Sequence, residues 1–252
     1  MLGSTVVSVG KAQLTVATYN IKGLSVDRAQ VVRVLRDLDA DVVAIQEVPR
    51  GAAGRARLES LADEVGLDVA VHGGYPRGGV TTAILTRPEV SARVRTRGYK
   101  VLPLDVWRWF STWRTRFIAP SRRGFCFIDL GEYVVFSVHL GLNASERMVH
   151  RNILLNAIKR LGPSRCVVAG DLNEPPAGDS WRALGRPLRD ALEGSITDDN
   201  AAAFNTFTAA RPRRRIDAIF VGDGITVDDA HVERSHAAKT GSDHLPYVVQ
   251  LS

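Results

Sequence analysis

The chain has 252 residues, of which 45% are hydrophobic and 24% are charged, with only two cysteines. These values are typical of a globular protein and exclude disordered, collagen-like and disulfide-stapled chains. A total of 33 Lys and Arg against 27 Asp and Glu gives a net charge of +6. This excess of positive charge favours phosphate-bearing or anionic membrane partners without distinguishing between them.

Strand-like runs, rich in β-branched and aromatic residues, recur along the chain between turn-forming residues. They cover residues 13–20, 41–48, 80–85, 124–130, 133–140, 165–170, 215–221 and 246–251. Helical periodicity falls between them, at residues 26–38, 58–65 and 145–161. Helices interleaved with strands predict sheets covered by helices, which we interpret as a single domain over residues 1–252.

The last of these helices is expected to begin with Ser145 as its N-cap. Its periodicity predicts a buried face that contains Met148, Ile153, Leu155 and Ile158.

The two cysteines, Cys126 and Cys166, stand in apolar runs without a Cys or His partner at metal-ligand spacing. We therefore expect buried free thiols. No window is long and apolar enough to span a membrane, and the first residues do not form a signal peptide. The chain as given is therefore expected in the cytoplasm, with peripheral attachment to a membrane as an alternative.

Polar residues of catalytic type stand at the ends of several predicted strands. They are Asn20, Glu47, His139, Asp171, Asn173, Asp217, Asp243 and His244. Taken singly, each could be an ordinary turn or strand-end residue. Because strand ends on a rigid scaffold commonly carry catalytic groups, we expect this set to converge on one edge of the fold.

The set, in its order along the chain, resembles the endonuclease/exonuclease/phosphatase superfamily of metal-dependent phosphoesterases, which includes DNase I, abasic-site endonucleases, inositol polyphosphate 5-phosphatases and neutral sphingomyelinases. The resemblance spans residues 14–251 and rests on TVATYNIKGL, DVVAIQEV, TTAILTR, SVHLGLNASER, VVAGDLNEPP, RRRIDAIFV and SDHLPYVVQL. It implies a four-layer α/β sandwich, in which two mixed sheets pack face to face with helices outside.

The resemblance also implies a metal site. Glu47 would bind Mg²⁺ or Mn²⁺, with Asn20 and Asp243 completing or supporting the site, since such hard cations prefer oxygen ligands. Some members of the superfamily, abasic-site enzymes in particular, have an acid two positions after the Asn, where this chain has Lys22. The resemblance thus implies that a metal ligand is absent here and that a cation contacts substrate phosphate instead.

The remaining motif residues are implied to act on the phosphate. Asp171 would orient or deprotonate the attacking water, and Asn173 would donate a hydrogen bond to a non-bridging oxygen. His244 would contact the scissile phosphate or assist proton transfer, with Asp217 accepting its other ring N–H. His139 would supply a second imidazole to the charged transition state.

The substrate is less well defined than the reaction. Between Arg93 and Arg123 the chain has nine basic residues against one acid, and Trp107, Trp109 and Trp113 lie among them. Interleaved aromatic and basic residues suit stacking on nucleic-acid bases, an interfacial belt on anionic lipid, or simply strands that pack in the core.

Two further substrate-binding candidates, Asn143 and Arg147, stand in HLGLNASER. Arg147 could equally buttress the site or be a solvated helix residue, and the run RPRRR at residues 211–215 could be a solvated turn. The histidines that match no motif are expected at the surface or as satisfied core residues. They are His72, His150, His231 and His236.

The sequence therefore predicts a divalent-metal phosphodiesterase, with a lipid headgroup or another phosphodiester slightly ahead of DNA as substrate. A DNA nuclease of the same family is the first alternative. A non-catalytic basic module that binds nucleic acid or membrane is the second. No motif points to an obligate protein partner.

Overall fold

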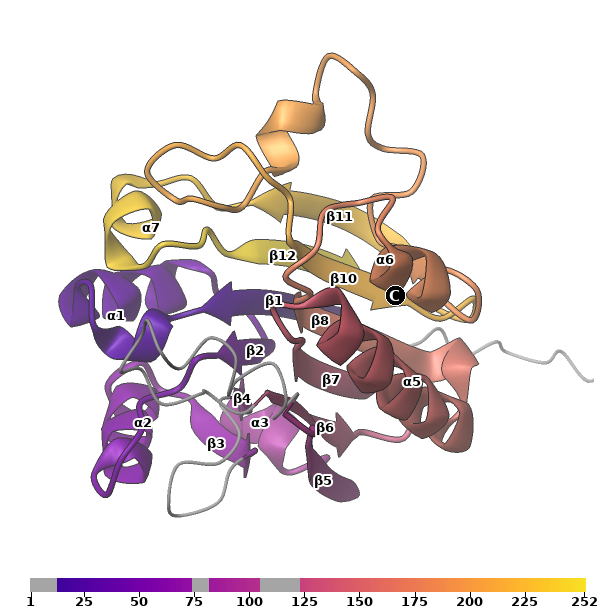
Figure 1. Ribbon diagram of the computed structural model, residues 1–252. Coiled ribbons are helices and arrows are strands. Elements are labelled where there is room, and N and C mark those ends of the chain that lie inside the picture. Colours follow the sequence, from indigo (N-terminus) through magenta and orange to yellow (C-terminus); the bar gives the residue numbers. More distant parts are fainter. Residues whose placement is uncertain (1–12, 74–81, 105–122) are drawn as a thin grey trace, which may run out of the picture.

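Two six-stranded mixed sheets pack face to face in the computed structural model, and helices lie on their outer faces (Figure 1). The structure describes residues 13–73, 82–104 and 123–252. Within these residues the fold is the four-layer α/β sandwich that the sequence predicts. The single-domain interpretation of residues 1–252 stays a prediction.

The first sheet has the strand order β11-β12-β1-β2-β4-β3. Its strands are β1 (Leu14–Asn20), β2 (Val42–Gln46), β3 (Asp68–His72), β4 (Thr82–Thr86), β11 (Val227–Val232) and β12 (Tyr247–Leu251). Only the central pair β1 and β2 is parallel. The helices that accompany this sheet in the chain are α1 (Arg28–Asp37), α2 (Gly54–Glu64), α3 (Pro88–Ser91) and α7 (His236–Gly241).

The second sheet has the order β5-β6-β7-β8-β10-β9. Its strands are β5 (Thr96–Val101), β6 (Gly124–Asp129), β7 (Val134–His139), β8 (Cys166–Asp171), β9 (Arg189–Asp190) and β10 (Asp217–Val221). Here β7 and β8 form the central parallel pair. The helices α5 (Ala144–Leu161) and α6 (Asp179–Leu184) cover its outer face (Figure 1). Short 3-10 turns are η1 (Lys22–Leu24), η3 (Pro163–Arg165) and η4 (Ala201–Phe204).

The two-residue period of β7 separates the two layers of the core. Val135 belongs to the cluster packed between the sheets. Val134 and Phe136 instead pack with Leu154 and Ile158 of α5 on the outer side. Because alternate side chains of a strand point to opposite faces, this pattern also decides on which face the polar residue at the end of the strand lies.

Helix α5 differs from its predicted form in two respects. Asn143, not Ser145, is the N-cap, and the buried positions are His150, Leu154 and Ile158, while Met148 is 48% exposed. Of the predicted face, Ile158 is fully buried and Ile153 and Leu155 are partly buried against the same cluster, so the prediction is wrong only for Met148. His150 accepts a hydrogen bond from the Gly141 backbone N–H and its Nε2 contacts the Pro103 carbonyl, so it is a satisfied core histidine, as expected.

The four strands β3, β5, β9 and β11 are not predicted from the sequence. Each lies at the end of a sheet, and β5 and β11 are largely exposed. Edge strands bury few side chains, so their sequences lack the apolar runs that reveal central strands.

Cys126 and Cys166 are both buried free thiols, as expected. No helix among the described residues has both the length and the apolar character needed to cross a bilayer.

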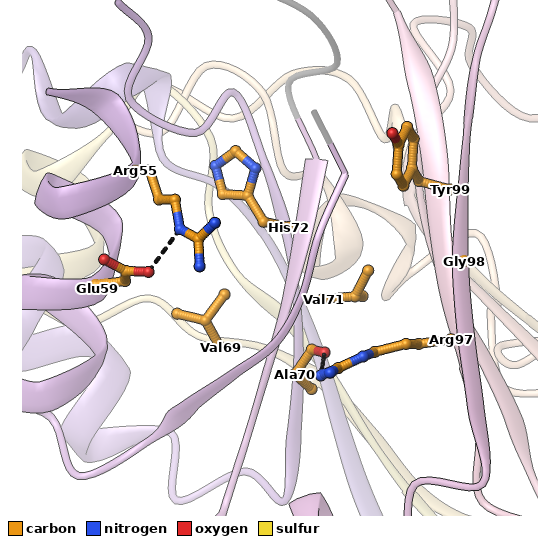
Figure 2. Close-up of a pocket in the computed structure, with 9 residues that line it drawn as sticks. All are labelled: Arg55, Glu59, Val69, Ala70, Val71, His72, Arg97, Gly98 and Tyr99. Carbon is orange, nitrogen blue, oxygen red and sulfur yellow. Dashed lines mark hydrogen bonds and ion pairs between the residues drawn. The ribbon is translucent and has the colours of Figure 1, made fainter. Parts of the chain in front are cut away.

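A hollow of about 570 Å³ lies between α2 and the adjacent edge strands β3 and β5 (Figure 2). Arg97 of β5 donates a hydrogen bond to the Ala70 carbonyl of β3, and Arg55 on α2 pairs with Glu59. The Arg97 contact satisfies a backbone group at an otherwise open strand edge.

Gly170 sets the close approach of β8 to β7, and we expect Gly170→Ala to be strongly destabilising. An added Cβ would lie 2.0 Å from the Val138 carbonyl oxygen, so the backbone must shift, at a cost of roughly 3 kcal/mol. Urea unfolding should show this loss. Gly194→Ala is the control, because Gly194 has φ +80° but open space around it, and its cost is about 1 kcal/mol. Equal losses at the two positions would contradict the packing argument.

Candidate functional site

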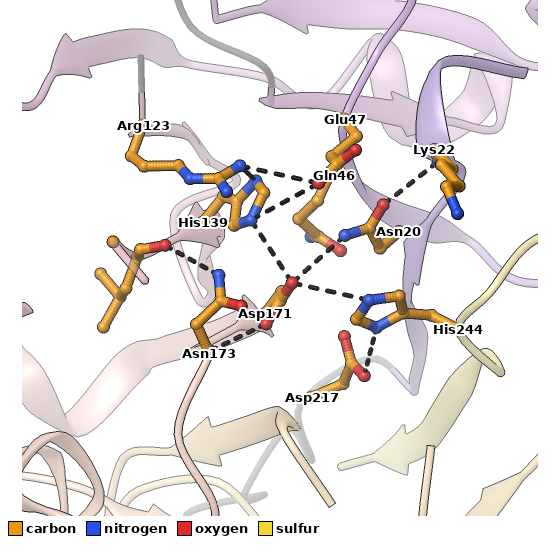
Figure 3. Close-up of polar contacts among 12 residues, drawn as sticks. Asn20, Lys22, Gln46, Glu47, Arg123, His139, Asp171, Asn173, Asp217 and His244 are labelled. Atoms are coloured by element: carbon orange, nitrogen blue, oxygen red, sulfur yellow. Dashed lines mark hydrogen bonds and ion pairs between the residues drawn. The ribbon is translucent and has the colours of Figure 1, made fainter. Parts of the chain in front are cut away.

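The predicted polar residues other than Asp243 lie together at one edge of the sandwich, where the two central parallel pairs end (Figure 3). In β8, Val167 and Ala169 face the other sheet, and the same period places Asp171 on that inner side. His139 pairs in register with Asp171 on one side, and Asp217 pairs with it on the other. The antiparallel strand β10 therefore contributes its first residue where β7 and β8 contribute their last.

Asp171 is the centre of this cluster and is only 2% exposed. Its Oδ2 accepts a hydrogen bond from Asn20 Nδ2 at 3.2 Å, across the interface between the sheets. The same oxygen lies 3.4 Å from His139 Nε2 and 3.8 Å from His244 Nε2. Its other oxygen accepts the backbone N–H of Asn173 at 2.8 Å.

His244 lies between two carboxylates. Its Nδ1 is 2.9 Å from Asp217 Oδ2, and its Nε2 faces Asp171. The ring also packs against Phe207, with the two centroids 4.9 Å apart. The imidazole is thus fixed in orientation by one acid on each side and by an aromatic ring.

A second imidazole, His139, is fully buried and adjoins a guanidinium. Arg123 Nη1 lies 3.0 Å from His139 Nδ1. Because a guanidinium has donors only, Nδ1 must be the acceptor, and the ring proton is therefore on Nε2. This proton points towards Asp171.

The two imidazoles are expected to differ in charge. Burial lowers the pKa of His244, but the neighbouring Asp217 and Asp171 outweigh this and raise it to about 9. Burial and the Arg123 charge both lower the pKa of His139. At neutral pH the site therefore holds an imidazolium at 244 and a neutral ring at 139.

The pKa values of the two buried aspartates are shifted in opposite directions. Burial opposes ionisation of Asp171, yet the hydrogen bond from His139 and the charge of His244 hold its pKa below the usual range. Burial raises the pKa of Asp217, and its Oδ1 has no hydrogen-bond partner among the described residues. Oppositely shifted titrating groups in a buried cluster are typical of functional sites.

The predicted metal ligands lie beside this cluster. Glu47 follows β2 with a left-handed φ of +52°, and its Oε1 is 3.6 Å from Arg123 Nη1. Asn20 Oδ1 accepts the backbone N–H of Lys22 at 3.1 Å. The ammonium of Lys22 pairs with Asp243 Oδ2 at 2.7 Å.

A second group could also hold an ion. Ligand atoms of Asp171, Asp217 and His244 lie within 4.8 Å of one another. A metal ion bound here would have to displace a proton from the imidazole, because His244 is held protonated by its two carboxylates in the metal-free protein. In this state the imidazolium itself supplies the positive charge between Asp171 and Asp217.

The remaining predicted site residues lie around the cluster or outside it. Asn173 donates its side-chain amide to the Leu140 carbonyl at 3.0 Å. Asn143 occupies the N-cap position of α5 without a side-chain capping hydrogen bond, and Arg147 contacts the Gly141 and Leu142 carbonyls. The residues Trp107, Trp109 and Trp113 lie outside the described part of the chain.

Arg147 is held by the protein on both sides. Its Nε is 3.7 Å from the carboxylate of Glu174, which accepts the backbone N–H groups of Asp179 and Ser180 at the start of α6. These contacts favour the interpretation that Arg147 buttresses the loop after β7. Within the run at residues 211–215, Arg215 is also structural, since it is 7% exposed and pairs with Asp190.

Arg123 is a residue of the cluster that is not predicted from the sequence. This residue directly precedes β6, whose Gly124 pairs with His139. The strand-end rule that found the other residues applies to it equally. Because Arg123 stands at the end of a run of basic residues, the sequence pattern does not distinguish it from solvated arginines.

The chain matches the model of the endonuclease/exonuclease/phosphatase family over residues 17–244. The chain therefore belongs to this family, which is the class of protein that the fold and the site indicate. A comparison with curated proteins finds no match.

Solved structures share the fold at low sequence identity. An endonuclease/exonuclease/phosphatase protein from Bacteroides vulgatus is 19% identical, with a TM-score of 0.71, covering 96% of this chain and 99% of that one. A mannosyl-6-phosphatase from Bacteroides thetaiotaomicron is 20% identical, with a TM-score of 0.68 and coverage of 95% and 99%. D. rerio TDP2, complexed with a single-stranded DNA product, is 19% identical, with a TM-score of 0.62 and coverage of 96% and 100%.

The raised pKa of His244 predicts that the metal-free protein loses stability at alkaline pH. The folded-state pKa of about 9 exceeds the ordinary value of 6.5, so the protonated ring stabilises the fold fully below about pH 6.5. This contribution, roughly 3 kcal/mol, is lost as the pH rises through 9. Urea unfolding from pH 6 to 10 in EDTA should show the loss in the parent protein but not in His244→Gln. His231→Gln, at an exposed position, should follow the parent, and parallel curves for all three proteins would refute the assignment.

Proposed function

We propose that the protein is a divalent-metal-dependent phosphodiesterase that cleaves a phosphate ester by in-line attack of water. The observation that carries this proposal is His244, fixed between Asp217 and Asp171 and next to amide, imidazole and guanidinium donors. Phosphoryl transfer demands such preorganised positive charge and hydrogen-bond donors.

The chemical groups of the predicted metal ligands fit a hard cation. Glu47 and Asp243 offer partly exposed carboxylates, and Asn20 offers an amide oxygen, which are the donor types that Mg²⁺ and Mn²⁺ prefer. When bound, the ion would polarise a phosphoryl oxygen and offset charge on the leaving group. Glu47 would be its principal ligand, with Asn20 and Asp243 in support.

Asp171 would act on the attacking water. The hydrogen bond from His139, the charge of His244 and the backbone N–H of Asn173 hold the pKa of this carboxyl low and keep it ionised at low pH. A carboxylate with such a low pKa is a weak base. Of the two roles that the sequence leaves open, orienting the water therefore fits Asp171 better than deprotonating it.

The two imidazoles would bind the phosphate in different charge states. His244, as an imidazolium held by Asp217, would contact a negatively charged oxygen and stabilise the transition state. His139, a neutral ring whose tautomer Arg123 keeps, would turn its one Nε2–H from Asp171 to the bound phosphate. The amide of Asn173 would donate to a non-bridging oxygen of the phosphate.

The substrate class is proposed on weaker grounds than the reaction. Net positive charge and the basic, Trp-containing stretch before β6 support a lipid headgroup or another phosphodiester, with DNA as the alternative. The solved structures that share the fold cover more than one class of ligand, since one is a mannosyl-6-phosphatase and another holds a single-stranded DNA product. A fold shared at such low identity supports each of these classes equally.

Hydrolysis of bis-p-nitrophenyl phosphate tests the proposed reaction. We expect turnover with Mg²⁺ or Mn²⁺ and none after EDTA treatment. Asp171→Asn and His244→Ala should each lower kcat by roughly 100-fold or more, because both groups act mainly in the transition state. Asp229→Asn and His231→Ala are matched controls, since these two residues form an exposed pair on β11. Full activity in chelator, or variants that change KM alone, would contradict the proposal.

The triple change of Trp107, Trp109 and Trp113 to Ala tests the substrate class. If the partner is a membrane, the parent protein should bind anionic vesicles with a salt-resistant component and a blue shift in tryptophan emission. The triple variant should then lose turnover of a vesicle-bound substrate and keep turnover of the soluble diester. Loss of plasmid cleavage with normal vesicle binding would instead support a nuclease, and an unfolded variant would place the three rings in the core.

A further inference from the structure

One of the candidate metal ligands already has a cation. Lys22 Nζ lies 2.7 Å from Asp243 Oδ2, and the two side chains are 45% and 30% exposed. A divalent ion that uses this carboxylate must therefore compete with an ammonium that belongs to the chain itself.

The backbone holds Lys22 at this place. Its N–H donates to Asn20 Oδ1, and the next N–H, that of Gly23, donates to the Glu47 carbonyl at 2.6 Å. Lys22 itself has a left-handed φ of +46°. The turn η1 is thus hydrogen-bonded to Asn20 at the end of β1 and to Glu47 after β2. These bonds hold the backbone of Lys22 next to both residues.

The carboxylate of Glu47, the other acidic metal ligand, faces a guanidinium and not an ammonium. Arg123 faces Glu47 at 3.6 Å but is also bound to His139, and it is only 9% exposed. A buried guanidinium held at two points cannot leave easily. Lys22 is half exposed and carries its charge on a flexible four-carbon chain, so it can move while its backbone stays in place.

We propose that Lys22 is an internal counter-ion that competes with the divalent metal for Asp243, and that metal binding releases its ammonium to contact the phosphate of the substrate. An ammonium and a divalent cation repel each other strongly at contact distance, so both cannot occupy the same carboxylate oxygen. The released charge then lies next to the phosphate-binding donors. The second half of this inference rests on the proposed function, whereas the competition for Asp243 does not.

The competition is tested by Mn²⁺ binding in the absence of substrate, measured by titration calorimetry. Lys22→Met should bind Mn²⁺ about fivefold more tightly than the parent, the effect expected from removing a partly exposed ion pair. Lys159→Met is the matched control, because it removes the same charge at an exposed position near the end of α5. Its Mn²⁺ affinity should stay within twofold of the parent value.

A double-mutant comparison identifies the carboxylate. With Asp243→Asn in the background, Lys22→Met should no longer change Mn²⁺ affinity. Unchanged or weaker Mn²⁺ binding by Lys22→Met, or a gain that persists in Asp243→Asn, would overturn the competition. Should Lys22→Met fail to fold, Lys22→Gly serves instead, because glycine accepts the left-handed backbone at this position.

Inorganic phosphate tests the released ammonium without requiring turnover. Calorimetric binding of phosphate to the Mn²⁺-saturated protein should be about tenfold weaker in Lys22→Met than in the parent and unchanged in Lys159→Met. Equal phosphate affinity in all three proteins would overturn this half of the inference. A protein that hydrolyses no diester but shows both effects would refute the proposed function alone.

Discussion

An ionised carboxylate buried between two sheets is the constraint on which the rest of the site depends. Asp171 cannot remain charged in that place without donors around it, and these come from both sheets: Asn20 from the first, His139 and the Asn173 backbone from the second. Two residues before His139 in β7, the Ser137 hydroxyl donates a hydrogen bond to the Ile45 carbonyl and accepts one from the Gln46 side-chain amide. These buried contacts between the sheets fix their separation, and so hold the Asn20 amide within reach of Asp171.

The same cluster shows how one residue type takes two roles. His139 and His244 both face Asp171 Oδ2 through Nε2. What differs is the group at Nδ1, which is a guanidinium for His139 and a carboxylate for His244. The partner behind each ring therefore sets its charge, and one ring becomes a neutral donor while the other becomes a cation. Both rings face the same oxygen of Asp171, so their positions alone do not account for the difference in charge. The difference comes from Arg123 behind one ring and Asp217 behind the other.

Much of this site could be predicted from the sequence, because it follows from strand period and strand ends. Once β8 is known to bury Val167 and Ala169 inward, the inward position of Asp171 follows. The pairing of Lys22 with Asp243 could not be predicted, since it depends on how a turn after β1 meets the residue before His244. Nor could the burial of His150 in α5, or the exposed edge strands β5 and β11. Local pattern fails where the decisive contact is made between distant loops.

The pairing of β12 with β1 has a consequence for the order of events during synthesis. Ser242 donates to the Asn20 carbonyl across 222 positions of the chain, and contacts between such distant residues form late because a long loop must close first. A nascent chain that has emerged only as far as β10 already carries Glu47, His139, Asp171 and Asp217. It lacks His244, and β1 still has an open edge. The polar cluster is therefore incomplete until the ribosome has delivered the segment that pairs with β1.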